Sequence, residues 1–317
     1  MVTGAGGMLG RRLVARLLRA GAIGAQQIAW VTATDIIAST GEIEDSRLMF
    51  VRADLSDARD ARALIARRPN IIFHLAAVVS GEAERDIDKG YRVNLAGGTN
   101  LLEAIRRERE RDYTPRLIFG SSIAVFGPPF PKVIDDDCAP SPRTSYGTQK
   151  AALELLLADH ARRGLVDAVG LRLPTICIRP GAPNAAASGF ISSIIREPLA
   201  GRNAVLPVPA STRYWIAGPD AAVGFLLHAA TLDTSALGHA RMMNMPGLSV
   251  SAGEQIEALR SIAGSGTVAR IKQALDPDII DMVRGWPSEF APARALALGF
   301  EAEKRIEDII TAHMREG

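Results

Sequence analysis

A tyrosine and a lysine, Tyr146 and Lys150, stand four residues apart in a stretch that reads as a helix from Ser145 to Arg162. On an α-helix this spacing places both side chains on one face, one turn apart. A positive charge beside a tyrosine favours the phenolate and lowers its pKa from about 10 toward the working pH. Such a tyrosine can take a proton from an alcohol, so the pair indicates acid–base chemistry.

A hydroxyl group upstream fits the same chemistry. The apolar residues Leu117–Phe119 predict a buried strand that ends in Gly120, Ser121 and Ser122. Open parallel sheets bind their ligands at the carboxyl ends of the strands, so we expect the Ser122 hydroxyl at that edge. The alternative for the tyrosine and the lysine is a surface pair in contact with water, which any chain of this length can contain by chance.

A polar amide interrupts the predicted helix 86–107. Asn94 lies among apolar residues there, and burying an amide costs free energy unless it is hydrogen-bonded. We expect Asn94 to bridge strands or to hold an ordered water molecule. Along the chain the order is then Asn94, Ser122, Tyr146 and Lys150.

A glycine-rich turn stands at the start of the chain, before the predicted helix Arg11–Ala20. Gly4, Gly7 and Gly10 allow a tight turn and a close approach of the backbone to a pyrophosphate, which would lie at the helix N-terminus. Only three residues precede Gly4, whereas a full strand needs about five. We therefore expect the natural start of the first strand to lie upstream of Met1.

An acidic residue follows the predicted second strand, Gln27–Thr34. Asp35 stands where a dinucleotide-binding fold binds the adenosine ribose hydroxyls, and its charge would repel a 2′-phosphate. This position favours NAD over NADP, the alternative being an ordinary turn aspartate. After the third predicted strand, Leu48–Arg52, Asp54 can cap the next helix, expected at 56–68, or face the adenine amino group.

Alternating strands and helices continue to residue 175, with further strands at Asn70–Leu75 and Ala168–Leu173. This alternation predicts a doubly wound parallel sheet of the α/β class. His74, inside an apolar run, is expected to be a packed core histidine. We assign residues 1–175 to a cofactor-binding domain. Residues 176–317 are expected to form mainly a smaller substrate-binding lid, with some segments returning to the first domain.

Composition limits the range of functions. The 317 residues are 47% hydrophobic, enough for a sizeable core, and the net charge of +2 gives no case for binding nucleic acid or an anionic membrane. Two cysteines, Cys138 and Cys177, are too few for a disulfide framework. Without a signal peptide or an apolar run that could cross a bilayer, the sequence predicts a cytoplasmic protein. The three aspartates at 135–137 are interpreted as a solvated loop, so no metal is expected.

These motifs together resemble the extended short-chain dehydrogenase/reductase superfamily, which includes NAD-dependent epimerases and dehydratases. The resemblance covers essentially the whole chain and implies a Rossmann-type fold that binds NAD. It implies that Tyr146 is the catalytic acid or base, that Lys150 holds the nicotinamide ribose and lowers the tyrosine pKa, and that Ser122 hydrogen-bonds the reacting oxygen. The positions it assigns to cofactor binding are Gly4, Gly7, Met8, Leu9, Asp35, Asp54, Leu55, Leu75, Ala76, Ala77, Asn94, Tyr146, Lys150 and Pro174.

Five stretches resemble members of the superfamily that oxidise a small sugar acid with NAD, namely 121–127, 146–150, 173–181, 184–190 and 196–199. A sugar acid needs cations for its carboxylate and polar groups for its hydroxyls, and the candidates are Ser122, Thr175, Asn184, Ser188, Arg196, Arg213 and Trp215. Arg213 ranks highest, because it stands where epimerases have an arginine for the diphosphate, and bidentate carboxylate binding suits it equally. The alternatives are a surface charge for Arg196, a strand-end cap for Thr175 and lid packing for Trp215.

Three rival functions fit this sequence less well. A nucleotide-sugar epimerase uses the same tyrosine and lysine, but here Tyr214 replaces an aspartate that often follows the arginine. A dehydratase needs an acidic pair after the hydroxyl residue, where Ile123 and Ala124 stand. A noncatalytic NAD-binding regulator would usually lose the tyrosine or the lysine. The resemblance also implies a homodimer that pairs through the helices carrying Asn94 and Tyr146.

Overall fold

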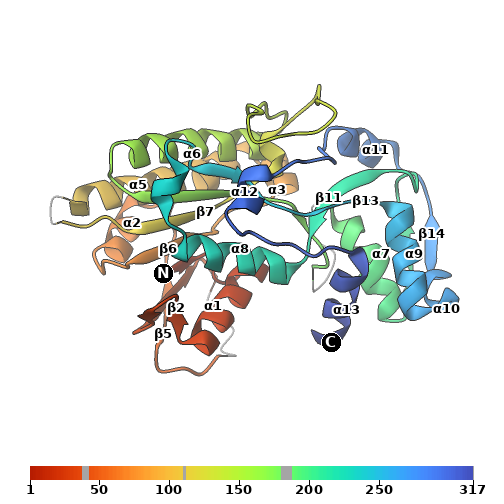
Figure 1. The fold of residues 1–317 in the computed structure, drawn as a ribbon, viewed down its shortest axis with the longest axis horizontal. Helices are drawn as coiled ribbons and strands as arrows, with labels where there is room; N and C mark the ends of the chain where they lie inside the picture. Colours follow the sequence, from red (N-terminus) through yellow and green to blue (C-terminus); the bar gives the residue numbers. More distant parts are fainter. Residues whose placement is uncertain (38–42, 110–111, 180–187, 317) are drawn as a thin grey trace. The chain divides into compact units, whose positions relative to one another are not determined.

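The structure, a computed structural model, describes residues 1–37, 43–109, 112–179 and 188–316 (Figure 1). The chain divides into two compact units. The first unit consists of Met1–Ser122, Thr144–Arg172 and Val223–Met243, and the second unit of Ile123–Arg143, Leu173–Ala222 and Asn244–Gly317. No helix in the described part of the chain is long and apolar enough to cross a membrane.

A seven-stranded sheet with the strand order β12-β8-β7-β6-β1-β4-β5 forms the centre of the first unit. Strand β1 pairs in parallel with β4 on one side and with β6 on the other, so the winding direction reverses at β1. This arrangement confirms the predicted doubly wound, Rossmann-type sheet. The strands are β1 Val2–Thr3, β4 Val31–Asp35, β5 Leu48–Arg52, β6 Ile71–His74, β7 Arg116–Ser122, β8 Asp167–Leu173 and β12 Met242–Asn244.

Helices flank this sheet, with α5 and α6 on one side and α1 and α8 on the other (Figure 1). On the first of these sides, apolar residues of α2, α5 and α6 pack on β6 and β7, among them Leu64, Leu101, Leu117 and Leu153. The helices are α1 Met8–Ala20, α2 Ala58–Ile65, α3 Ser80–Arg85, α4 Ile87–Gly90, α5 Gly97–Glu108, α6 Ser145–Arg162 and α8 Pro219–Thr231, with the 3₁₀ helix η4 at Thr234–Leu237.

Three of the predicted elements differ from the structure in their bounds or their type. Gln27 does not begin the second sheet strand, because it belongs to a small hairpin of β2 Ala22–Ile23 and β3 Gln26–Gln27. The expected single helix 86–107 is three consecutive segments, α4, the π-helical segment η1 Tyr91–Ala96 and α5. The helix expected at 56–68 is shorter, since Asp57 caps it and it ends at Ile65.

Among its described residues, the second unit contains two small sheets. Strands β9 Thr175–Ile176, β11 Arg213–Ala217 and β13 Leu248–Ser251 form one of them, and β10 Ala204–Leu206 pairs in parallel with β14 Ile271–Gln273 in the other. The helices are η3 Ile123–Val125, α7 Gly189–Leu199, α9 Ala252–Ala263, α10 Ser265–Val268, α11 Pro277–Arg284, α12 Ala293–Ala297 and α13 Ile306–Glu316.

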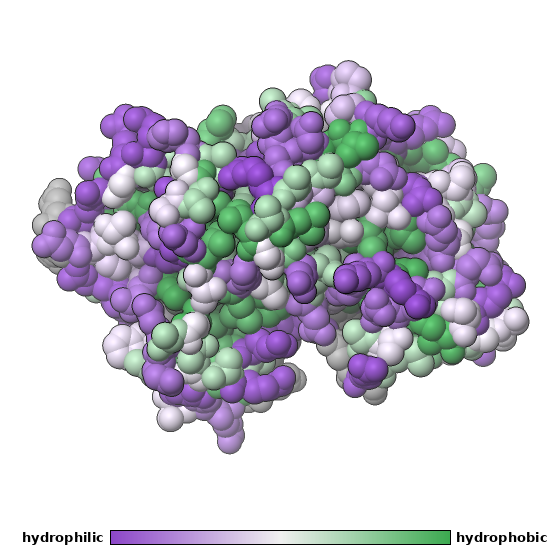
Figure 2. Space-filling model, in the orientation of Figure 1, coloured by the Kyte–Doolittle hydropathy of each residue, from purple (hydrophilic) through white to green (hydrophobic). Residues whose placement is uncertain are grey.

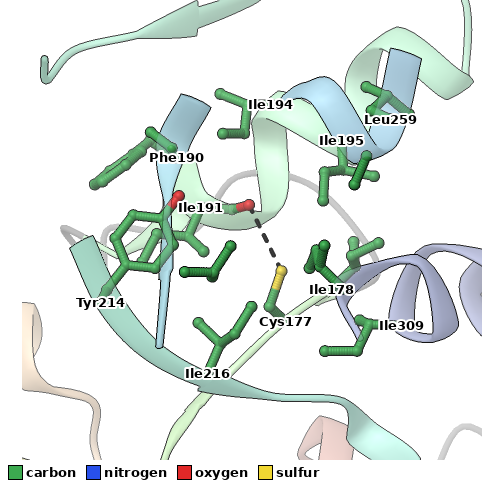
Figure 3. Close-up of a cluster of buried hydrophobic side chains, with 14 of the residues drawn as sticks. Cys177, Ile178, Phe190, Ile191, Ile194, Ile195, Tyr214, Ile216, Leu259 and Ile309 are labelled. Carbon is green, nitrogen blue, oxygen red and sulfur yellow. Dashed lines mark hydrogen bonds between the residues drawn. The ribbon is translucent and has the colours of Figure 1, made fainter. Parts of the chain in front are cut away.

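An apolar core with one polar network holds the second unit together. Figure 3 shows the Cys177 thiol directed at the Ile191 carbonyl oxygen among surrounding apolar side chains. Gln255 donates to the same carbonyl at 2.8 Å and accepts a hydrogen bond from the Tyr214 hydroxyl. Burial raises the pKa of Cys177 to about 12, so this thiol stays protonated at neutral pH.

Candidate active site

The glycine turn joins β1 to α1 with almost no room for side chains. Gly4 has φ +70°, and a Cβ there would come within 2.7 Å of the Ala76 backbone nitrogen. A Cβ on Gly10 would overlap the Gly4 carbonyl oxygen. Helix α1 begins at Met8 without a side-chain cap at Gly7 and without an acidic residue in its first turn. The positive end of the helix is therefore suited to an anion such as a pyrophosphate.

Asp35, at the end of β4, lies beside this turn. Its Oδ2 accepts a hydrogen bond from the Gly6 N–H at 2.9 Å, and its Oδ1 accepts one from the Ile37 N–H at 3.2 Å. The carboxylate is thus fixed next to the glycines, as the ribose-binding interpretation requires. Asp54 does not cap α2, because Asp57 does, and its Oδ1 instead accepts from the Ser56 N–H.

Tyr146 and Lys150 lie on the first two turns of α6, and Lys150 is 3% exposed. The Lys150 Nζ donates to the Gly120 carbonyl oxygen at 2.8 Å. It also lies 4.7 Å from the ring centroid of Phe119 and 5.7 Å from that of Tyr146. Burial lowers the pKa of Lys150 to about 8, and the charge of Glu154 opposes that shift. The predicted tyrosine–lysine pair is therefore formed, with the cation facing the phenol ring.

The predicted hydroxyl, Ser122, is the last residue of β7. The strand ends at Ser122, as the sequence predicted, and it begins at Arg116. Ser122 is half-buried and lies two residues after Gly120, whose carbonyl oxygen binds Lys150. Because Ser122 follows Gly120 so closely on the same strand, its hydroxyl lies at the end of β7 where Lys150 binds.

Asn94 and His74 are both buried near this edge of the sheet. Asn94 accepts from the Val78 N–H at 2.8 Å and donates to Gln149 Oε1 at 2.8 Å, so it bridges the loop after β6 and helix α6. The expectation that Asn94 would bridge strands is wrong, because it connects a loop to a helix. His74 hydrogen-bonds Thr3 through Nδ1 at 2.9 Å, and burial lowers its pKa to about 3. It is the packed core histidine that the sequence predicted.

Comparison with known proteins identifies the family. A model of the NAD dependent epimerase/dehydratase family matches residues 1–244. The chain belongs to this family. This membership confirms the predicted cofactor, NAD, and the relatives described next confirm the predicted enzyme class, a dehydrogenase of the extended short-chain dehydrogenase/reductase type.

Three proteins are similar to this chain over at least 98% of its length. D-erythronate dehydrogenase of Cupriavidus necator is 44% identical over 320 residues, which cover 100% of this chain and 98% of that protein. D-erythronate dehydrogenase of Haemophilus influenzae is 38% identical over 310 residues, covering 98% of this chain and 96% of that one. The crystal structure of a nucleoside-diphosphate-sugar epimerase from Agrobacterium tumefaciens is 51% identical, with a TM-score of 0.96, and the match covers 99% of this chain and 93% of that one.

The second unit holds the other residues that the sequence analysis selected. Thr175 lies on β9, opposite Ile216 of β11, and Ser188 is the half-buried residue before α7. Arg196 is 8% exposed, forms an ion pair with Glu197 and donates a hydrogen bond to the Arg179 carbonyl oxygen at 2.6 Å. Pro174 is buried in the link between β8 and β9. Asn184 lies outside the described residues.

Arg213 and Trp215 project from the same strand, β11. The Arg213 side chain is 37% exposed, pairs with Glu254 at 2.7 Å and donates to the Ser249 carbonyl oxygen at 2.8 Å. Trp215 is 7% exposed, donates to the Met245 carbonyl oxygen and packs against the Phe290 ring at 5.3 Å. Arg213 thus remains reachable from water, whereas Trp215 packs within the second unit.

A buried charge cluster at the carboxyl end of β7 was not predicted from the sequence. Glu154, four residues after Lys150, accepts from Ser121 Oγ and is paired with Arg172 of β8. The spacing of Glu154 was a usable signal, since it continues the face that carries Tyr146 and Lys150. Among the described residues, no group of three or more His, Cys, Asp or Glu side chains could hold a metal ion.

Proposed function

We propose that this enzyme oxidises a secondary alcohol of a small sugar acid with NAD, converting D-erythronate to 2-dehydro-D-erythronate. The observation that carries the proposal is the contact of the buried Lys150 ammonium with both the Gly120 carbonyl oxygen and the Tyr146 ring, which supports Tyr146 as the proton acceptor for the family's NAD chemistry. The choice of substrate is supported by two full-length relatives that are D-erythronate dehydrogenases.

The residues present fit a bound dinucleotide. Gly4 and Gly10 let the backbone of the turn pack closely on neighbouring backbone, the uncapped start of α1 suits the pyrophosphate, and Asp35 suits the adenosine ribose. We assign the remaining contacts to Met8, Leu9, Leu55, Leu75, Ala76, Ala77 and Pro174, with Asp54 near the adenine. When bound, NAD supplies the acceptor for the hydride that leaves the substrate carbon.

The residues of the first unit supply the proton chemistry. Tyr146 takes the proton from the substrate hydroxyl, since the ammonium of Lys150 favours its phenolate form. Ser122 hydrogen-bonds the same oxygen as it becomes a carbonyl and so aligns it with Tyr146. Lys150 also holds the nicotinamide ribose, which fixes the reacting atoms relative to one another.

For the substrate carboxylate we propose Arg213, whose guanidinium can bind it in a bidentate manner. Because Arg213 already contacts Glu254, the substrate must replace or share that contact. Thr175, Ser188 and Arg196 remain candidates for the hydroxyls, and Asn184 is retained from the sequence.

We place the reaction in the cytoplasm, in keeping with the free thiols of Cys138 and Cys177.

Replacing the phenol tests the assignment of the acid–base residue. In Tyr146→Phe we expect turnover to fall about 10²- to 10⁴-fold, the usual contribution of a general base, while NADH binding stays within about threefold of the original protein. NADH formation followed by absorbance and NADH binding followed by fluorescence give the two readouts. Tyr113→Phe is the matched control, because that hydroxyl bonds the Pro69 carbonyl oxygen away from the site. Retained turnover in Tyr146→Phe would overturn the assignment.

A nucleotide-sugar epimerase is the alternative, and the similar Agrobacterium tumefaciens structure carries that description. An epimerase returns the hydride to its substrate, whereas a dehydrogenase releases NADH. Incubation with free NAD therefore separates the two. Net NADH from a sugar acid supports the dehydrogenase, and interconversion of UDP-sugars without NADH supports the epimerase.

A further inference from the structure

Helix α6 carries a third functional side chain one turn beyond Lys150. Tyr146, Lys150 and Glu154 follow one another at intervals of four residues, which places them along one face of the helix. Lys150 and Glu154 are each 3% exposed. A carboxylate is rarely buried to this degree unless it is paired and hydrogen-bonded.

Lys150 and Glu154 bind two consecutive residues of β7. The Lys150 Nζ donates to the Gly120 carbonyl oxygen at 2.8 Å, and Glu154 Oε1 accepts from Ser121 Oγ at 2.5 Å. The next residue of the strand is Ser122. These two contacts therefore fix the longitudinal position of α6 against the strand end that carries the proposed catalytic hydroxyl.

Arg172 pairs with Glu154. Its guanidinium donates through Nε to both carboxylate oxygens at 3.1 Å and through a second nitrogen to Oε2 at 2.8 Å. Arg172 comes from β8, the neighbour of β7 in the sheet. A bidentate pair of this kind offsets the cost of removing the carboxylate from water.

We propose that Glu154 is a positioning residue that keeps Lys150 positively charged and in register with Ser122 and Tyr146. The inference rests on the proposed role of Lys150 in holding the nicotinamide ribose. Glu154 acts through Lys150 and contacts neither substrate nor cofactor.

Among the described groups that act on Lys150, Glu154 is the charge that favours the protonated form of the lysine. On α6 these groups are Tyr146 and Glu154, and His74 on β6 is electrostatically coupled to the lysine. The pKa of His74 is about 3, so it carries no charge at neutral pH. Burial lowers the pKa of Lys150 to about 8 and the anion of Glu154 raises it. Below about pH 8 the lysine is charged, and the charge is lost as the pH rises through that value.

The test is the pH dependence of NADH affinity, measured by fluorescence titration. In the original protein we expect NADH binding to weaken as the pH rises through about 8. Glu154→Gln keeps the shape and an acceptor for Ser121 but removes the charge, so the midpoint of this loss should move to lower pH by about one unit. The matched control is Asp167→Asn, which breaks the partly buried Arg116–Asp167 pair at the other ends of β7 and β8. In the control we expect lower thermal stability and an unchanged midpoint.

A second variant keeps the proposal testable if Glu154→Gln does not fold. In Glu154→Gln/Arg172→Met no buried charge is left without a partner, and such replacements are often tolerated. The midpoint should still move to lower pH, because Glu154 is the charge that acts on Lys150. An unchanged midpoint in either folded variant, or an equal shift in Asp167→Asn, would overturn the proposal. Since the readout needs no substrate, its failure is distinct from a failure to oxidise D-erythronate.

Discussion

At the scale of single residues, a buried lysine needs neighbours that make its charge tolerable. Lys150 has the Gly120 carbonyl oxygen, the faces of two aromatic rings and the anion of Glu154. The same contacts restrict where its ammonium can lie. The four-residue spacing predicted that the lysine would lie near Tyr146, and these contacts explain why it stays there.

Asp35 provides a prediction about cofactor choice. Its carboxylate accepts from the Gly6 N–H, and we assign it to the ribose hydroxyls, where a 2′-phosphate would be repelled. In Asp35→Ser we expect NAD to bind about tenfold more weakly, since a hydrogen bond to a charged group is lost, and the preference for NAD over NADP to shrink. Dissociation constants for both cofactors measure the effect.

The control for this substitution is Asp281→Ser, on the exposed face of α11 in the second unit, which should bind NAD and NADP like the original protein. Equal affinity of the original protein for the two cofactors would contradict the role of Asp35.

At the scale of elements, local sequence predicted some boundaries and not others. Helix α6 and strand β5 have the bounds that were expected, because capping and apolar patterning are local. The π-helical segment Tyr91–Ala96 could not be predicted, since Asn94 binds Val78 and Gln149, which are distant in sequence. Its apolar pattern resembles that of an ordinary helix.

In the candidate site, too, some features could be predicted from local sequence and others could not. The tyrosine, the lysine and the serine could be placed from one helix and one strand end, because each motif is short. The pairing of Glu154 with Arg172 could not be predicted, since it depends on β8 lying beside β7 in the sheet. The partner of Arg213, Glu254, likewise comes from another element, the first turn of α9.

The turn between β1 and α1 makes a prediction about an element. Gly10→Ala places a Cβ against the Gly4 carbonyl oxygen, which should lower the free energy of unfolding by about 1–3 kcal/mol and abolish tight NADH binding. Gly224→Ala is the matched control, because this helical glycine of α8 has nothing within 4 Å of the added Cβ. The control should gain up to about 1 kcal/mol from helix propensity. Thermal unfolding and NADH titration compare the two, and equal behaviour would refute the close packing of the turn.

At the scale of the whole molecule, the surface carries a mixture of residue types. Figure 2 shows hydrophilic residues over much of one face of the molecule, with smaller hydrophobic areas between them. The net charge of +2 agrees with a small-molecule enzyme better than with a nucleic-acid-binding protein. Apolar side chains are nevertheless exposed on the segments that the resemblance assigns to a dimer, namely Tyr91 at 41% and Leu155 at 74%.

We therefore propose a homodimer that pairs through the helical segments carrying Asn94 and Tyr146. Leu155→Asp would place a charge in that interface, and we expect it to convert a dimer into a monomer in light scattering at micromolar concentration. Leu296→Asp, at an exposed position of α12 in the second unit, is the control and should leave the dimer intact. A monomeric original protein would refute the pairing.

The most direct measurement of the central claim is NADH formation from D-erythronate and NAD by the purified enzyme and its Tyr146→Phe variant. The account predicts sustained release of NADH by the original enzyme and a loss of at least about 10²-fold in the variant, with NADH affinity preserved. Equal rates in the two proteins, or UDP-sugar interconversion without any NADH, would contradict it.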